Sequence, residues 1–180
     1  MQALQTLYRA IDRLNETVGR GVAWLALLMV LTQFVVVVMR YVFGVGSIWM
    51  QESVVYMHGL LFMVGAGYTL LHGGHVRVDV FYREAEPRTK ARVDLAGVIL
   101  FLLPVCALII IYSWSYVMKA WAVHEGSLET SGIQAVYLLK TVVLAFAVLV
   151  GLQGISLAVR SALILMGIER PAGADEHERG

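Results

Sequence analysis

Residues 21–39 read GVAWLALLMVLTQFVVVVM, an apolar run without Asp, Glu, Lys or Arg. Three further stretches, 53–71, 95–118 and 141–159, share this property, and each contains at least 19 residues. An α-helix of about 20 residues crosses the hydrocarbon core of a bilayer. Lipid offers no partner to backbone N–H and C=O groups, so such stretches must satisfy these groups internally as helices. The sequence therefore predicts an all-α membrane protein with four transmembrane helices.

The overall composition also indicates a bilayer location. Hydrophobic residues make up 59% of the 180-residue chain and charged residues only 15%, whereas soluble domains carry about 25% charged residues. The net charge of +1 argues against a nucleic-acid partner, because nucleic-acid-binding domains are usually strongly basic. The single cysteine, Cys106, excludes an intrachain disulfide and a Cys-x-x-Cys redox site. No small-x-small cleavage site follows the first apolar run, so we expect that helix to be retained.

The basic residues divide unequally between the two ends of the predicted helices. One side of the membrane receives eleven of the 14 Lys and Arg residues, and the other side three. The larger group comprises Arg9, Arg13, Arg20, Arg77, Arg83, Arg88, Lys90, Arg92, Arg160, Arg170 and Arg179. The smaller group comprises Arg40, Lys119 and Lys140. Because Lys and Arg accumulate on the cytoplasmic side during insertion, both termini and the central loop are predicted to be cytoplasmic.

The chain divides into three parts. A membrane domain, residues 21–165, is expected to hold helices at about 21–43, 51–72, 87–119 and 137–165. Residues 1–20 carry apolar side chains at a helical spacing, namely Leu4, Leu7, Ile11, Leu14 and Val18. Charged residues lie between them, which predicts a short amphipathic helix on the inner membrane surface or on a partner. The polar tail, residues 166–180, is predicted to be disordered.

Glycine and proline mark the breaks in this pattern. Gly73 and Gly74 adopt left-handed torsions easily and are expected to end the second helix. Pro87 suits the first turn of the third helix. Pro104 lies inside that helix and should bend it, because proline lacks a backbone donor and crowds the preceding turn. Residues 75–81 alternate polar side chains with valines, which predicts an interfacial turn or short helix.

Few side chains could support chemistry. His72 and His75 are the obvious metal candidates, but a zinc site needs three or four ligands. Only Asp79 and His58 are further candidates, and His58 lies deep in the second span. A haem in the membrane would need facing histidines, and only His58 is deep enough. A proton-coupled exporter would need a carboxylate within the membrane, and the four stretches contain none. We therefore predict no catalytic residue, no metal and no cofactor.

Small and hydroxyl residues in the spans indicate close contacts between helices. They are Gly65, Gly67, Ser113, Ser115, Gly151, Gly154 and Ser156. Such residues suit packing within the bundle and packing against another membrane subunit equally well. Composition does not distinguish these two uses.

Three motifs add a family resemblance. MRYVFG at 39–44 and IWMQES at 48–53 flank the first short loop, and GGHVRVDVFY at 73–82 follows the second span. With the four-span hydropathy of residues 20–165, this pattern resembles the small permease subunit (DctQ-like) of the tripartite ATP-independent periplasmic (TRAP) transporters. The resemblance implies a scaffold subunit in the bacterial inner membrane that supports a large permease subunit. It also implies sodium-coupled uptake of a solute, an organic acid, captured by a soluble periplasmic solute-binding protein.

The resemblance further suggests structural roles for the motif residues. On the outer face, Trp49 would anchor the second helix at the membrane interface. Glu52, favoured near a helix N-terminus, would pair with Arg40 across the hairpin or contact a partner. Gln51 departs from the family pattern, where glutamate is common, so a role requiring two negative charges is not supported. An inner-face motif would hold the interfacial turn against membrane lipids, and it comprises Gly73, Gly74, His75, Arg77 and Asp79.

Two alternative functions stay open at the level of sequence. One is a four-helix membrane electron carrier that binds haem, and the other is an autonomous small channel or exporter. A Soret absorption band in the purified protein would indicate the first. Transport without any other subunit would indicate the second.

Overall fold

The computed structural model describes residues 2–75 and 85–168, and this part of the chain is helical without strands. The elements are α1 (Gln2–Val42), α2 (Ile48–Leu71), α4 (Pro87–Gly97), the π-helical turn η1 (Val98–Leu102), α5 (Leu103–Ala122) and α6 (Val136–Leu165). Because α4, η1 and α5 follow one another without a break, the described residues form four long helices. All four are long and apolar enough to cross a membrane. The predicted all-α fold with four membrane spans is confirmed.

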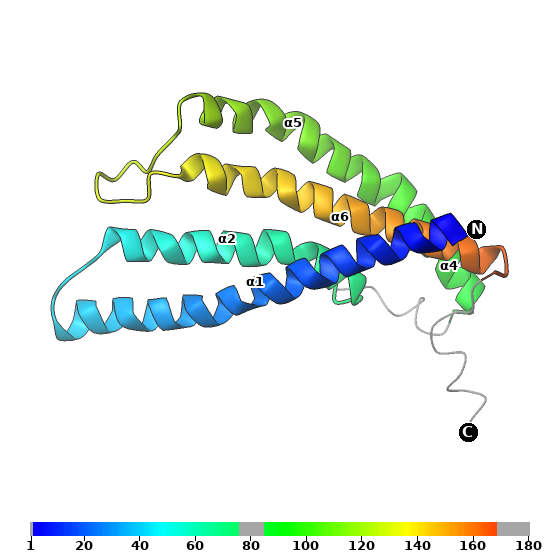
Figure 1. The fold of residues 1–180 in the computed structure, drawn as a ribbon, viewed down its shortest axis with the longest axis horizontal. Helices are drawn as coiled ribbons and strands as arrows, with labels where there is room; N and C mark the ends of the chain where they lie inside the picture. The colour runs from blue at the N-terminus through cyan, green and yellow to red at the C-terminus, as the bar shows by residue number, and fades with distance from the viewer. Residues whose placement is uncertain (1, 76–84, 169–180) are drawn as a thin grey trace, which may run out of the picture.

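The four helices form two antiparallel hairpins, with α1 beside α2 and α5 beside α6 (Figure 1). The α1–α2 loop and the α5–α6 loop lie at one end of the bundle, which we call the loop end. The first turns of α1 and the last turns of α6 lie at the opposite end, which we call the terminal end. α6 packs on α1, α2, α4 and α5, and it contributes more buried residues than any other helix. It therefore forms the centre of the bundle.

Glycines allow the helices to approach one another closely. Gly67 of α2 is buried, and a Cβ there would lie 2.1 Å from Asn15 Oδ1 of α1 and 3.3 Å from the Leu149 carbonyl oxygen of α6. A Cβ at Gly154 of α6 would lie 2.4 Å from Leu102 Cδ2. Small residues of this kind let membrane helices pack backbone to backbone. At these two glycines, the observed use is packing within the bundle.

The first helix differs from the expected one at residue 20. α1 runs through 41 residues without a boundary, so residues 2–20 do not form a separate helix. The first half of α1 crosses α6 near the terminal end (Figure 1), and Tyr8, Ile11 and Asn15 are buried there. A helix of this length measures about 60 Å, twice the hydrocarbon thickness of about 30 Å. α1 is therefore longer than one membrane crossing requires, and its first half packs on α6.

Local signals set both ends of α2. Ser47 is the N-cap, and its Oγ accepts a hydrogen bond from the Met50 backbone N–H at 3.4 Å. At the other end Gly73 has a φ of +64°, and the Gly74 N–H donates to the Thr69 carbonyl oxygen at 2.8 Å. A left-handed glycine followed by such a bond is a common helix end. α2 thus covers residues 48–71, where 51–72 was expected.

The third span contains a wider turn next to its proline. η1 directly precedes α5, and Pro104 is the second residue of α5. A proline ring crowds the carbonyl group one turn earlier, and a π-helical turn makes room by adding a residue to that turn. The span ends at Ala122, three residues beyond the expected 119. The bend expected at Pro104 stays a prediction.

The fourth span covers residues 136–165, where 137–165 was expected. Gly167 follows it with a φ of +72°, and its N–H donates to the Ile164 carbonyl oxygen at 3.0 Å. This is the same kind of helix end as in α2. Residues 169–180 of the predicted tail lie outside the described residues.

Candidate functional site

A polar cluster joins α1 to α6 at the terminal end. We call Asp12, Asn15, Gln153, Ser156 and Arg160 the terminal cluster. Asp12 Oδ1 accepts hydrogen bonds from Gln153 Nε2 at 2.9 Å and from Ser156 Oγ at 2.6 Å. Arg160 Nη2 donates to Asp12 Oδ2 at 2.8 Å. Asn15 Nδ2 donates to Gln153 Oε1 at 2.8 Å. One carboxylate thus contacts three residues of α6.

The centre of the terminal cluster is shielded from solvent. Asn15, Gln153 and Ser156 are each at most 4% exposed. Their hydrogen bonds therefore satisfy groups that would be costly to bury unpaired. Asn15 Oδ1 has no hydrogen-bond partner, and it lies against Gly67, whose Cα–H is at most a weak donor. A shift of α1 along α6 would break these bonds, so the terminal cluster fixes the register of the two helices.

A second contact at the terminal end joins α1 to the end of α2. Glu16 Oε2 lies 2.7 Å from His72 Nε2, and Glu16 Oε1 accepts a hydrogen bond from Arg20 Nε at 2.6 Å. Glu16 precedes the uncharged stretch of α1, so it lies outside the membrane-spanning segment. The hydrogen bond from His72 lowers the pKa of the Glu16 carboxyl below its usual value, and Arg20 adds to this effect. In the structure, His72 therefore ties two helices together.

Glu52 of α2 holds the α5–α6 loop at the loop end. One of its carboxylate oxygens accepts a hydrogen bond from Ser127 Oγ. The other accepts one from the Ile133 backbone N–H at 2.5 Å. A Cβ at Gly132 would lie 2.3 Å from Ser127 Oγ and 2.7 Å from Glu52 Oε1, so the loop passes too close to Glu52 for a larger residue. Glu52 thus connects the α1–α2 hairpin to the α5–α6 hairpin.

The predicted ion pair between Arg40 and Glu52 is wrong. The structure describes both residues and places no ion pair between them. The loop donors already occupy the Glu52 carboxylate. Arg40 is exposed in the last turn of α1. Trp49 is 58% exposed and Gln51 is partly exposed, and their proposed interface and partner contacts stay predictions.

Polar contacts also join α5 to α6 near the loop end. Lys140 Nζ donates to Glu125 Oε2 at 2.5 Å and lies 4.2 Å from the centre of the Tyr116 ring. Trp121 Nε1 donates to Thr141 Oγ1 at 2.8 Å. A cation over an aromatic face and an indole N–H with a partner are both favourable near a membrane interface. These contacts fix the second hairpin where it leaves the membrane.

Only part of the predicted inner-face motif is described. Gly73, Gly74 and His75 are exposed after the end of α2. Arg77 and Asp79 lie outside the described residues, so the joint role of the five residues stays a prediction. Among the described residues, no three His, Cys, Asp or Glu side chains gather in a group that could hold a metal ion.

The surroundings of His58 do not fit a haem between the helices. Its side chain is exposed on α2, and its ring stacks on Phe62 with 6.2 Å between ring centres. A haem held by histidines needs them to face one another across the bundle. No other histidine occurs in the four uncharged stretches.

Sequence reasoning missed the terminal cluster. A signal existed, because Gln153 is a polar residue within an apolar span, and buried polar residues in membrane helices usually have partners. A second signal was that Asn15 lies one turn from Ile11 and two turns from Tyr8, on the buried side of α1. None of these contacts forms a nucleophile–base pair. The arrangement positions helices and carries no catalytic chemistry.

The fold and these contacts define an integral-membrane helical bundle that is tied together at both ends. The sequence profile of the family "Tripartite ATP-independent periplasmic transporters, DctQ component" matches residues 28–163. This match covers more than half of the chain, and the chain therefore belongs to that family. The family is an inner-membrane transport component and not an enzyme. The resemblance drawn from the sequence motifs is confirmed.

A similar protein is known from Vibrio cholerae. This chain is 33% identical to the Vibrio cholerae "C4-dicarboxylate TRAP transporter small permease protein DctQ" over 88 residues, which are 49% of this chain. The match covers 38% of the length of that protein. No solved structure matches this chain.

Proposed function

We propose that this chain is a fixed scaffold, or stator, that supports the large permease subunit of a TRAP transporter. The observation that carries the proposal is where the polar groups lie. Asp12, Gln153 and Glu52 join helices to one another at the two ends of the bundle. The four uncharged stretches contain no Asp, Glu, Lys or Arg, and the polar Gln153 within the fourth stretch is engaged in contacts between helices. A route for ions or acids usually needs ionisable groups at membrane depth, whereas a scaffold needs a fixed shape.

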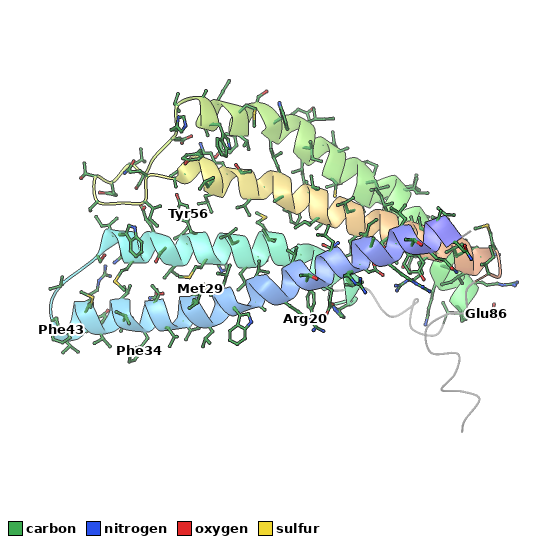
Figure 2. The ribbon with its side chains drawn as sticks, viewed as in Figure 1. Arg20, Met29, Phe34, Phe43, Tyr56 and Glu86 are labelled. Atoms are coloured by element: carbon green, nitrogen blue, oxygen red, sulfur yellow. The ribbon has the colours of Figure 1, made fainter. Side chains whose placement is uncertain are left out.

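The outer surface of the bundle supports a lateral partner. Large apolar side chains point outward from α1 and from the third span, including Phe34 of α1 at 66% and Leu100 of η1 at 65% exposed. Figure 2 shows Phe34 on the side of α1 away from α2. Lipids and the large permease subunit would share this surface. The positive-inside distribution of Lys and Arg supports a cytoplasmic location for the terminal end.

We infer that the transporter takes up an organic acid together with sodium, after a soluble periplasmic solute-binding protein has captured the solute. The printed name of the similar Vibrio cholerae protein, which specifies C4-dicarboxylates, supports an acid. The large permease subunit and the solute-binding protein, rather than this chain, would set the specificity.

Reconstitution into liposomes tests the proposal. Vesicles would contain this chain alone, the large subunit alone, or both, each with the solute-binding protein, a C4-dicarboxylate and an inward sodium gradient. We expect accumulation of the acid in the vesicles that contain both subunits. Accumulation with this chain alone would contradict the scaffold role. Failure of the two subunits to purify together from the membrane would contradict the partnership.

A further inference from the structure

We propose that one side of the α1–α2 hairpin is the surface on which a membrane-spanning helix of the large permease subunit docks. The inference rests on the proposed function and adds the location of the contact. We call this surface the α1–α2 face and define it by Val22, Gln33, Arg40, Gln51, His58 and Phe62.

Helix geometry places these residues along one side of each helix. Successive residues turn by about 100° around the axis. Gln33 follows Val22 by eleven residues, so its direction differs by only about 20°, and Arg40 follows Val22 by eighteen residues, or five whole turns. On α2, His58 lies one turn before Phe62 by the same rule. Val22 of α1 and Phe62 of α2 line one groove, to which Phe146 of α6 also contributes, so the two stripes share a side of the hairpin.

The groove occupies the terminal half of the α1–α2 face. Its volume is about 730 Å³, and its lining includes Ala23, Gly65 and Ala66. These small side chains leave room for the side chains of a neighbouring helix. The occupant is identified by the polar residues farther along the face, His58, Gln33 and Arg40, and not by the shape of the groove.

His58 is a hydrogen-bonding residue at mid-membrane. It lies ten residues from the start of α2 and thirteen from its end, or about 15 Å and 20 Å along the axis. The side chain is exposed, and its observed contact within the described chain is the stack on Phe62. Lipid tails cannot accept the imidazole N–H, so exposure to them would leave a polar group unsatisfied. A protein partner removes this cost.

Gln33 repeats this feature on the neighbouring helix. It lies nine residues before the end of α1, about 14 Å along the axis, which is close to the depth of His58. Its side chain is also exposed. On α5 the exposed residues near this depth include the apolar Leu108 and Ile111 and the aromatic Tyr112, which is 78% exposed. The α1–α2 face differs because it presents two hydrogen-bonding side chains, His58 and Gln33, on adjacent helices at one depth, and this pair favours a polar partner.

Charge distinguishes the large subunit from a second copy of this chain. All copies insert with the same orientation, so a symmetric pair through this face would bring Arg40 near Arg40 at one depth. Like charges placed together oppose association. A different chain can offer an acidic or carbonyl acceptor to Arg40 and a hydrogen-bonding side chain to His58. The occupant is thus a helix of the large permease subunit with these two features.

Site-specific photocrosslinking in the co-expressed complex tests the proposal. Benzoylphenylalanine would replace Val55 or Phe62, which are 58% and 67% exposed along the α2 stripe. Matched controls would carry it at Leu108 or Ile111 on α5, which are 50% and 66% exposed. We expect crosslinks to the large subunit from the two α2 positions and none from the α5 positions. Crosslinks from α5 alone, or from α2 only to lipid or to a second copy, would overturn the proposal.

A substitution at His58 provides an independent measurement. Interhelical hydrogen bonds in membranes contribute about 0.6–2 kcal/mol, so His58→Leu should weaken recovery of the large subunit roughly three- to thirtyfold. His58→Gln keeps a hydrogen-bonding side chain and should restore most of the recovery. The melting temperature of the isolated chain should stay unchanged, because His58 is exposed. Full recovery with His58→Leu would exclude this contact, whereas absence of co-purification in the unmodified complex would contradict the proposed function itself.

Discussion

Gly67 lies where α1, α2 and α6 pack together, and these helices can approach so closely because glycine has no side chain. An added methyl group would lie 2.1 Å from Asn15 Oδ1 and 3.3 Å from the Leu149 carbonyl oxygen. Overpacking a rigid site costs about 1–3 kcal/mol. We expect Gly67→Ala to lower the free energy of unfolding by about that amount, measured by unfolding in detergent or bicelles.

Gly21→Ala is the matched control for Gly67→Ala. Apart from its chain neighbours and the nearby backbone of its own helix, no heavy atom lies within 4 Å of a Cβ built at Gly21, and that residue is also helical. Alanine is better than glycine in a helix by about 0.5–1 kcal/mol. The control should therefore be neutral or slightly stabilising. Equal destabilisation by both substitutions would mean that close packing at Gly67 is unimportant.

Asp12 of α1 makes most of the hydrogen bonds that join the terminal cluster to α6. Asp12→Ala would remove the acceptor for Gln153, Ser156 and Arg160. Arg160 is 42% exposed, so its exposed ion pair contributes at most about 1 kcal/mol. Gln153 Nε2 would be left buried without this acceptor, which costs about 1–3 kcal/mol more. Ser156 Oγ keeps the Tyr8 carbonyl oxygen as a partner at 3.4 Å. We expect a loss of about 1–4 kcal/mol in the free energy of unfolding, and a smaller loss for Asp12→Asn.

Thr17→Ala serves as the comparison for Asp12→Ala. Thr17 is exposed on the same helix, and its hydroxyl donates only within α1, to the Arg13 carbonyl oxygen at 2.8 Å. This substitution should change stability little. If Asp12→Ala were no worse than Thr17→Ala, the terminal cluster would not hold α1 on α6.

The conformation of the α5–α6 loop depends on a contact from the other hairpin. Glu52 of α2 accepts the Ile133 backbone N–H and the Ser127 hydroxyl. Hydrogen bonds to charged groups contribute about 1.5–3 kcal/mol. We expect Glu52→Ala to speed amide hydrogen exchange in the loop, and most at Ile133, by roughly ten- to a hundredfold.

Arg40→Ala separates this interpretation from the ion pair expected from sequence. Arg40 has no ion pair with Glu52, so its removal should leave loop exchange at the unmodified rate. The same acceleration from Arg40→Ala as from Glu52→Ala would show that the two side chains act together after all. Hydrogen exchange followed by mass spectrometry resolves the loop from the helices.

For the whole molecule, hydropathy predicted the spans because one physical rule governs them. A stretch without charges that is long enough to cross lipid must be helical. All four uncharged stretches lie within described helices, with α4, η1 and α5 taken together. The ends of the helices were less predictable, since they depend on local bonds such as the one between Met50 N–H and Ser47 Oγ.

The contacts between helices could not be predicted in the same way. Gln153 bonds to Asp12 across 141 positions of the chain, and no local pattern relates the two. Glu52 has a backbone N–H as its partner 81 positions away, where the sequence offered Arg40 close by. Family resemblance identified the type of subunit, but a resemblance in motifs does not specify which side chains meet.

The direction of the bundle across the membrane depends on an argument from charge. The starts of α1 and α4 and the end of α6 all lie at the terminal end, so the structure brings the charge-rich segments together (Figure 1). Positively charged segments resist translocation, which predicts that the terminal end is cytoplasmic and the loop end periplasmic.

Single cysteines in a Cys106→Ala background measure this orientation. Leu128, fully exposed in the α5–α6 loop, would become cysteine in one variant, and Arg9 or Arg88 in the others. A membrane-impermeant maleimide added to intact spheroplasts should label Leu128→Cys alone, and lysis should make the other two reactive. Labelling of Arg9→Cys and Arg88→Cys before lysis would reverse the orientation. It would also place Glu52 and the loop it holds in the cytoplasm, away from any periplasmic solute-binding protein.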